Sequence, residues 1–237
     1  MGTDMFWINK IIFSKHKIFL LKKILKLRSF RFVRELIYSI KHPEEQDVIK
    51  LPSLSMPDKK IIFVDIGAFE GDFASAFCQR HPDSKGYLIE PVDTFVEVLT
   101  KKFATEGHVV IPKALTDHGG MISLSDLGAS SSSVTGEQVR TFESISVDEL
   151  NSLITEDTID LFQINCEGGE YEILPRIIES NMIRRIYAIN IQYHYMNPTN
   201  ILRRWQINRK LSRTHKLVWS VFFIWERWEI KVASDEK

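Results

Sequence analysis

Short apolar runs separated by helical stretches fill the chain from about residue 60 onward. The first run, "KIIFVDI" at residues 60–66, has no polar alternation, which is typical of a strand that is buried on both faces. Strands that alternate with helices at this spacing are joined by right-handed crossovers. The pattern therefore predicts an α/β fold with a mostly parallel, Rossmann-like sheet and helices on both faces.

The expected elements follow one another along this region. Strands are expected at residues 60–66, 85–91, 108–115, 119–126, 139–146, 159–165 and 183–194, with two more between residues 216 and 232. Helices are expected at residues 71–81, 92–107, 147–155, 169–181 and 197–214. In such sheets ligands bind beyond the carboxyl ends of the strands, so the residues that follow each strand are the candidates for a functional site.

The first part of the chain differs from the rest in charge. Residues 10–41 hold ten Lys or Arg and one acid, Glu35, whereas the whole chain has a formal net charge of zero. Apolar residues recur there at steps of three or four, which predicts a basic amphipathic helix. We expect residues 1–55 to form a basic helical extension and residues 56–237 to form the main domain.

Two kinds of partner fit this extension. It can pack on its own domain or on a second copy of the chain, giving a homodimer, or residues 10–41 can lie peripherally on an anionic membrane. No nucleic acid is expected, because no RNA-binding module accompanies the charge. Cys78 and Cys166 suit neither a disulfide framework nor a zinc site. With no membrane-spanning run and no secretory signal, the expected location is cytoplasmic.

The stretch "IIFVDIGAFEGDF" at residues 61–73 ends the first strand with an acid. Asp65 stands where a dinucleotide-binding loop needs a glycine, and Gly67 and Gly71 are four residues apart rather than three. A carboxylate there disfavours a pyrophosphate and suits a cationic group such as an amino-acid ammonium. We expect Gly67 to permit a sharp turn against the ligand and Gly71 to let the next helix pack closely.

A second acid ends the next strand. Glu90, in "YLIEP", can accept hydrogen bonds from both hydroxyls of a ribose. A ligand with an ammonium at one end and a ribose at the other is S-adenosylmethionine, whose sulfonium also suits a negative pocket. The sequence therefore predicts S-adenosylmethionine as cofactor.

The stretch "IDLFQINCEGGEYEIL" at residues 159–174 is the other informative motif. Its strand runs into Glu167 and two glycines, and Glu170 falls in the first turn of the next helix, where a carboxylate suits the helix dipole. Glu167 is therefore expected to face the ligand crevice.

These motifs resemble those of the FkbM family of S-adenosylmethionine-dependent methyltransferases. The resemblance covers roughly residues 60–195 and rests on "VDIGAFEGDF", "LIEP", "KALTD", "GASSSS", "SISVDEL" and "QINCEGGEYEIL". This chain has Gln163 and Asn165 where the family usually has lysine and aspartate. The resemblance implies a class I methyltransferase fold and, most often, methylation of a hydroxyl on a sugar or similar metabolite.

Taken together, the strand ends and the resemblance give the expected site residues. The cofactor set is Asp65, Gly67, Phe69, Gly71, Phe73, Glu90, Ala114 and Asn165. Two groups at strand ends, Glu167 and His194, are candidates to take the acceptor's proton, and Glu167 is expected to contact either the acceptor or the methyl donor. No metal is expected, because these two residues lack a further carboxylate.

Two other classes of function remain open. A nicotinamide-dependent oxidoreductase can use the same sheet, but Asp65 breaks the glycine pattern that it needs. A non-catalytic cofactor-binding module, or a membrane-surface module directed by the basic extension, is the other alternative.

Overall fold

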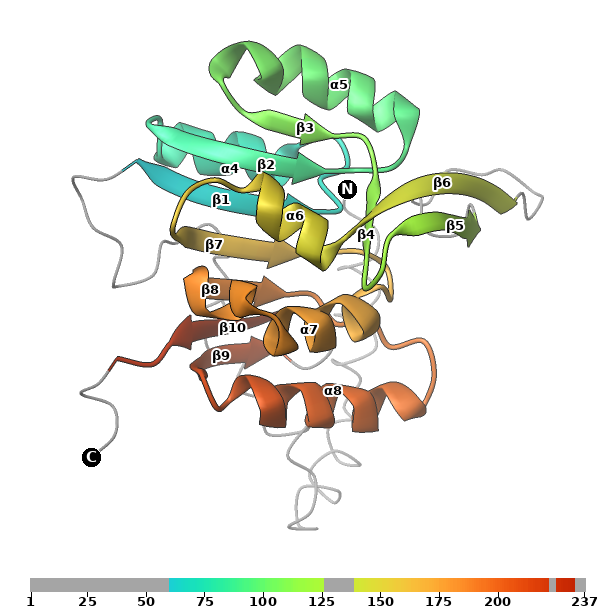
Figure 1. Cartoon of the computed structure of the whole chain (residues 1–237), viewed down its shortest axis with the longest axis vertical. Coiled ribbons are helices and arrows are strands. Elements are labelled where there is room, and N and C mark those ends of the chain that lie inside the picture. Colours follow the sequence, from blue (N-terminus) through green and yellow to red (C-terminus); the bar gives the residue numbers. More distant parts are fainter. Residues whose placement is uncertain (1–59, 126–138, 222–224, 233–237) are drawn as a thin grey trace, which may run out of the picture.

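The computed structural model describes residues 60–125, 139–221 and 225–232 (Figure 1). The strands of the main sheet are β1 (Ile61–Ile66), β2 (Ser84–Ile89), β3 (Val109–Ile111), β7 (Ile159–Ile164), β8 (Ile186–Ile191), β9 (His215–Val221) and β10 (Trp225–Ile230). The α-helices are α4 (Asp72–Arg80), α5 (Asp93–Phe103), α6 (Val147–Leu153), α7 (Glu170–Glu179) and α8 (Thr199–Leu211), with short 3-10 turns at Ala104–Glu106 and Asn181–Arg185.

The seven strands lie in the order β3-β2-β1-β7-β8-β10-β9. Strands β1, β2, β3, β7 and β8 run parallel, and β10 is antiparallel to both of its neighbours. The chain winds outward from β1 through β2 to β3 and then returns to β7 on the other side of β1. This reversal puts a ligand crevice beyond the carboxyl ends of β1 and β7.

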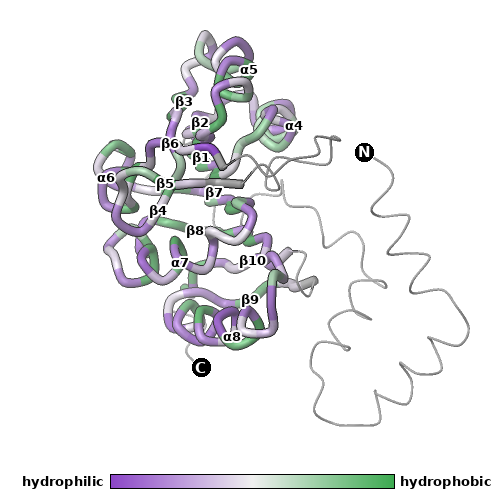
Figure 2. The backbone as a smooth tube through the Cα atoms, turned by 90° about the vertical axis from the view of Figure 1, so that its right-hand side faces the viewer, coloured by the Kyte–Doolittle hydropathy of each residue, from purple (hydrophilic) through white to green (hydrophobic). Residues whose placement is uncertain are grey.

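Helices cover both faces of the sheet (Figures 1 and 2). On one face α6, α7 and α8 contribute to the larger core cluster, which also includes Ile62, Val64 and Ile66 of β1. On the other face α4 and α5 pack on Phe63 of β1 within the smaller cluster. Because both faces of β1 are covered, the run "IIFVDI" has no polar alternation, and the Rossmann-like architecture expected from it is confirmed.

One expected strand is wrong. Residues 108–115 were expected to form a single strand, but Pro112 and Lys113 interrupt it. Residues Val109–Ile111 join the main sheet as β3, and β4 (Ala114–Thr116) enters a small sheet with β6 (Val139–Ser146) and β5 (Gly120–Ser125). A proline cannot donate to a ladder, so the chain changes sheets at this point.

Several expectations fall on residues that the structure does not describe. They are the basic helix within residues 10–41, the extension of residues 1–55 and the "GASSSS" motif of the family resemblance. Within the described part of the chain, no helix has the length and hydrophobicity of a membrane span.

Candidate active site

Backbone hydrogen bonds hold the ends of β1, β2 and β7 together. The N–H of Gly67 donates to the carbonyl of Ile89 at 3.0 Å, and the N–H of Asn165 donates to the carbonyl of Ile66 at 2.9 Å. The residues that follow these strands therefore share one edge of the sheet, as the sequence predicted.

The two glycines after β1 are explained by packing. A Cβ on Gly67 would lie 2.0 Å from the carbonyl oxygen of Asn165, and the backbone φ of +77° is itself unfavourable for other residues. The loop after β7 thus fills the space beside Gly67. A contact between Gly67 and a cofactor stays a prediction. A Cβ on Gly71 would lie 2.5 Å from the Phe103 ring, so this glycine lets α4 pack against α5, as expected.

Asp65 is buried at the end of β1 and is 1% exposed. Its Oδ2 atom makes no hydrogen bond to any described residue. Burial, followed by the charge of Glu90, raises the pKa of Asp65 from 3.8 to about 7, while a hydrogen bond with Gln163 acts in the opposite direction. A buried carboxyl oxygen without a partner indicates a place for a donor or a cation that the chain does not supply.

Glu90 lies beside Asp65 and is also buried. Its Oε2 accepts a hydrogen bond from the N–H of Phe69 at 3.0 Å, and its Oε1 accepts one from the N–H of Val92 at 3.0 Å. Burial raises the pKa of Glu90, and these two hydrogen bonds lower it. A carboxylate has about four acceptor positions, so two remain for a diol.

The remaining residues expected to bind the cofactor have different surroundings. Phe69 has a φ of +50° and its ring centroid lies 4.1 Å from that of Phe95. Phe73 packs against the smaller core cluster, with its ring 6.2 Å from that of Phe63. Ala114 is the buried first residue of β4. Their contact with a cofactor stays a prediction.

Glu167 and His194 lie side by side at the ends of β7 and β8. The His194 Nε2 and Glu167 Oε2 atoms are 3.4 Å apart. Glu167 has a φ of +47°, and Phe69 is the only other described non-glycine residue with a positive φ. Both strained positions occur in the loops that flank the crevice, and such strain concentrates at functional sites.

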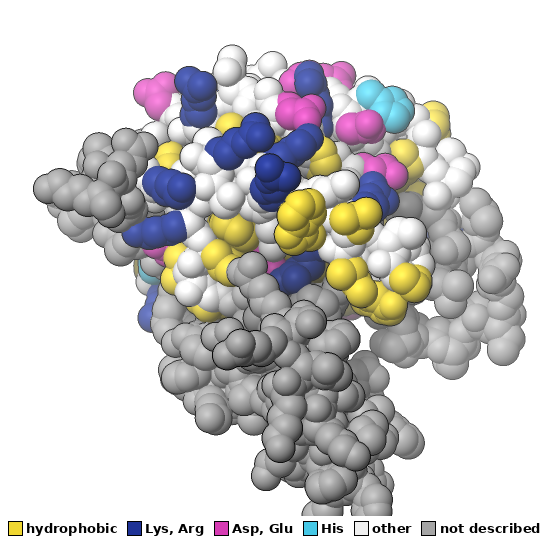
Figure 3. Space-filling model, turned by 90° about the horizontal axis from the view of Figure 1, so that it is seen from below, with side chains coloured by type: hydrophobic (Ala, Val, Ile, Leu, Met, Phe, Trp, Pro, Cys, Tyr) yellow, Lys and Arg dark blue, Asp and Glu magenta, His cyan; other side chains and the backbone are white. Residues whose placement is uncertain are grey.

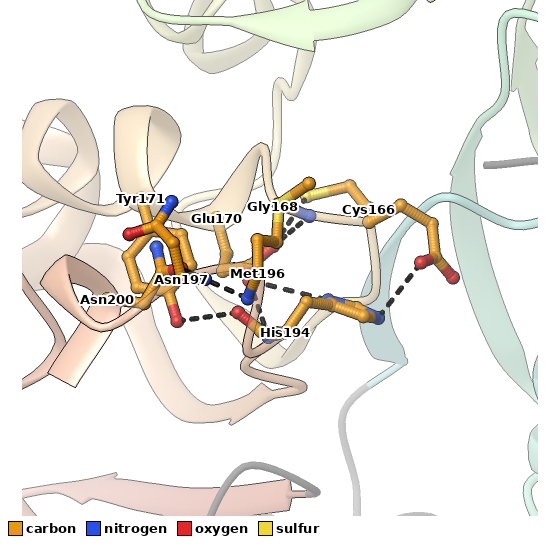
Figure 4. A network of polar contacts seen from close by, with 9 residues as sticks. Cys166, Gly168, Glu170, Tyr171, His194, Met196, Asn197 and Asn200 are labelled. Atoms are coloured by element: carbon orange, nitrogen blue, oxygen red, sulfur yellow. Dashed lines mark hydrogen bonds and ion pairs between the residues drawn. The ribbon is translucent and has the colours of Figure 1, made fainter. Parts of the chain in front are cut away.

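Glu170 lies between the backbones of Gly168 and His194 and joins them (Figure 4). It is 0% exposed, and its two carboxyl oxygens accept hydrogen bonds from the N–H groups of Gly168 and His194, both at 2.8 Å. Its Oε1 also lies 3.4 Å from Nδ1 of His194. The sequence placed Glu170 in the first helical turn but did not predict that it joins the loops after β7 and β8.

The two carboxyl groups change the charge of His194. Burial lowers the pKa of His194, but hydrogen bonds and ion pairs with Glu167 and Glu170 outweigh it and raise the pKa to about 9. The hydrogen bond from His194, against an opposing effect of burial, lowers the pKa of Glu167. At neutral pH the pair is therefore an imidazolium and a carboxylate, which favours Glu167 over His194 as the group that takes the acceptor's proton. Both roles stay predictions.

Gln163 and Cys166 have clear structural roles. Gln163 stands opposite Asp65 and Asn190 in the sheet register, where it hydrogen-bonds with Asp65 and accepts from Asn190 Nδ2 at 3.5 Å. Burial raises the pKa of the Cys166 thiol well above its ordinary value. Cys166 packs against the larger core cluster as a small side chain.

The donor set at these strand ends suits S-adenosylmethionine. A partnerless buried carboxyl oxygen on Asp65 and the free acceptor positions of Glu90 match an ammonium and a ribose diol. Among the residues that the structure describes, no three His, Cys, Asp or Glu side chains are grouped to hold a metal ion.

Several solved structures resemble this chain. The FkbM methyltransferase from Methylobacillus flagellatus KT has a TM-score of 0.49 and 14% identity over 76% of this chain and 45% of its own. The METTL16 methyltransferase domain has a TM-score of 0.45 and 12% identity over 83% of this chain and 68% of its own. TrmK from M. capricolum, in complex with S-adenosylhomocysteine, has a TM-score of 0.36 and 13% identity over 73% of this chain and 62% of its own.

The chain thus spans 45% of the length of the first of these proteins. No curated protein sequence matches it. The profile of the methyltransferase FkbM domain, however, matches residues 65–212, which include every strand-end residue described above. The chain has a class I methyltransferase fold and belongs to the FkbM family of methyltransferases.

Proposed function

We propose that this methyltransferase moves a methyl group from S-adenosylmethionine to a hydroxyl of a small molecule or sugar. Membership of a methyltransferase family makes S-adenosylmethionine the cofactor. The observation that carries the proposed binding mode is the partnerless buried oxygen of Asp65 beside Glu90. In this mode Asp65 binds the ammonium and Glu90 binds the ribose diol.

The proposed cofactor, when bound, supplies an electrophilic methyl carbon and a neutral thioether as leaving group. Glu167 would accept a hydrogen bond from the acceptor hydroxyl and take up its proton on methyl transfer. His194, protonated and supported by Glu170, holds the carboxylate of Glu167 in place. Glu167 suits the acceptor side because its side chain is 57% exposed, whereas that of His194 is 17% exposed.

Cofactor binding separates this proposal from its main rival. We expect S-adenosylhomocysteine to bind in isothermal titration calorimetry and to raise the melting temperature, whereas NADH does neither. Stabilisation by NADH and not by S-adenosylhomocysteine would instead support the nicotinamide-dependent oxidoreductase. A screen of sugars and other hydroxylated metabolites with labelled methyl donor then identifies the acceptor. Binding without transfer to any acceptor would favour the non-catalytic module.

The role of Glu167 predicts the pH dependence of the chemical step. Glu167→Gln is expected to lower the single-turnover rate about 100-fold, because the amide cannot accept the proton. In the wild type the rate should stay constant from neutral pH to about pH 9 and then fall, because His194 loses its proton there and no longer holds Glu167.

Glu172 is exposed on the same helix as Glu170. Glu172→Gln is therefore the matched control and should retain the wild-type rate and pH profile. A wild-type rate that instead rises up to about pH 9 would identify deprotonated His194 as the base and contradict the assignment to Glu167.

A further inference from the structure

Helix α8 presents an apolar and basic surface to solvent on the side opposite the core. Its buried residues are Asn200, Arg204, Ile207 and Leu211. At 3.6 residues per turn, Leu202, Trp205 and Arg209 lie on the opposite side of the helix. Leu202 is 57% exposed and Trp205 is 54% exposed. The core therefore uses one side of α8 and leaves two large apolar side chains in water on the other.

The same surface is rich in positive charge. Helix α8 contains no Asp or Glu, and its Arg203, Arg209 and Lys210 are exposed, with Lys210 paired to Glu179 of α7. Seen from the α8 side, Lys and Arg side chains gather beside hydrophobic ones in the middle of the face (Figure 3). The Arg209 guanidinium lies 5.6 Å from the centre of the Trp205 ring, so charge and aromatic surface meet directly.

This surface continues to the candidate active site. Tyr195 and Met196, which follow His194, are 55% and 65% exposed. A Cβ on Gly168 would lie 2.5 Å from the Met196 sulfur, so this apolar side chain reaches the loop that carries Glu167. The exposed apolar side chains thus extend from the middle of α8 to the edge of the sheet where the acceptor is proposed to bind.

The combination of charge and apolar exposure favours one kind of partner. A second copy of the chain docked through the same surface would bring two basic faces together, which is unfavourable. A nucleic acid would match the charge but would gain little from burying Leu202. An anionic lipid surface matches both features, since basic side chains attract its headgroups and Trp and Leu side chains enter the boundary between headgroups and acyl chains.

We propose that the outer side of α8, with Leu202, Trp205 and Arg209 at its centre and Tyr195 and Met196 at its edge, docks the methyltransferase domain onto an anionic membrane surface. This contact is made by the described domain and is separate from the one expected for residues 10–41. It adds a location to the proposed function and does not depend on which atom is methylated.

Co-sedimentation of the full chain with phosphatidylcholine vesicles, with and without phosphatidylglycerol, tests the proposal. Wild-type protein should bind the anionic vesicles, and high salt should weaken the binding. Arg209→Glu should reduce the partition coefficient about tenfold, since it removes one basic side chain that attracts the anionic headgroups and adds a carboxylate that they repel. Leu202→Ser combined with Trp205→Ala should reduce it by a similar or larger factor.

Leu153→Ser is the matched control, because Leu153 is 52% exposed on α6, away from this surface. It should bind vesicles like the wild type, and all variants should bind S-adenosylhomocysteine like the wild type, which separates this test from that of the proposed function. Brominated lipids should quench wild-type tryptophan fluorescence more than that of Trp205→Phe, independently of any binding by residues 10–41.

Two results would overturn the proposal. One is that the α8 variants bind anionic vesicles as tightly as the wild type and that bromolipid quenching does not depend on Trp205. The other is that analytical ultracentrifugation finds a wild-type dimer that the double variant abolishes, with no vesicle binding by either protein. The second result would assign this surface to a second copy of the chain.

Discussion

Asp65→Asn is expected to lose S-adenosylhomocysteine binding and, at the same time, to make the ligand-free protein more stable. Asp65 is buried, and its Oδ2 has no hydrogen-bond partner among the described residues. The proposed partner is the ammonium of the ligand. Replacing the carboxylate by an amide removes a desolvated charge pair, so affinity should fall at least about 100-fold.

The gain in stability follows from the pKa of Asp65. The folded, ligand-free protein has a pKa of about 7 for this group, and the ordinary value is 3.8. The folded state therefore binds the proton more tightly, and ionising Asp65 destabilises it progressively as the pH rises from 3.8 to about 7. Above that range the destabilisation reaches roughly 4 kcal/mol, which is an upper bound for the gain on substitution.

Denaturant unfolding at two pH values checks this reasoning. Asp65→Asn should raise the free energy of unfolding by several kcal/mol at about pH 8 and by much less at about pH 5. The control is Asp72→Asn, an exposed position in the first turn of α4, which should change neither stability nor affinity appreciably. A variant that binds S-adenosylhomocysteine normally, or that is destabilised equally at both pH values, would contradict the assignment of Asp65.

The same titration predicts how affinity depends on pH in the wild type. Only the ionised form of Asp65 pairs with an ammonium, and burial together with the charge of Glu90 raises the pKa of Asp65. With a pKa of about 7, the affinity for S-adenosylhomocysteine should rise about tenfold between roughly pH 6 and pH 8. Calorimetry across this range, in buffers of different ionisation enthalpy, should also detect the proton released on binding.

The positions of Asp65 and Glu90 were predictable because they depend on strand ends alone. A strand without alternation of apolar and polar residues can be located in the sequence, and so can its carboxyl end. Parallel strands bring their carboxyl ends to one edge of the sheet. Asp65 and Gln163 are direct partners in the sheet register. The strand expected at residues 108–115 failed because apolar composition does not show that a chain passes from one sheet to another.

The state of His194 could not be predicted in this way. A sequence places His194 near a strand end, but it does not show that the ring lies between Glu167 and Glu170, which come from a different loop and helix. Those contacts decide its charge. The role of Glu170 was missed for the same reason, since the direction of a side chain at a helix start depends on which backbone donors the neighbouring loops leave unpaired.

Glu170→Ala is expected to be the most destabilising of the substitutions considered for this site. The fully buried carboxyl group accepts hydrogen bonds from the N–H groups of Gly168 and His194 at 2.8 Å each. Its removal leaves both donors without that acceptor and deletes one of the two carboxyl partners of the His194 ring. The loss should be about 3–5 kcal/mol in the free energy of unfolding.

Glu170→Gln provides a graded test because it keeps the shape of the side chain. The amide oxygen replaces one of the two carboxyl acceptors. The NH₂ group takes the place of the other and faces a backbone N–H that it cannot accept from, so the free energy of unfolding should fall by about 1–3 kcal/mol. Glu167 still contacts His194 in this variant, and the pKa of His194 should fall from about 9 without returning fully to its ordinary value. The raised pKa of His194 stabilises the folded wild-type protein. This stabilisation is complete below pH 6.5 and is lost as the pH rises through about 9. The difference in stability between Glu170→Gln and the wild type should therefore shrink at high pH.

Denaturant unfolding and NMR titration of the His194 ring measure these two effects separately. Glu172→Ala, an exposed change on the same helix, controls for helix propensity and should alter neither. If Glu170→Ala unfolded within about 1 kcal/mol of the wild type while His194 still titrated near 9, Glu170 would not be the group that joins the two loops. If instead stability fell and the His194 pKa stayed high, Glu167 alone would account for the charge of the imidazole, and Glu170 would act only on the backbone.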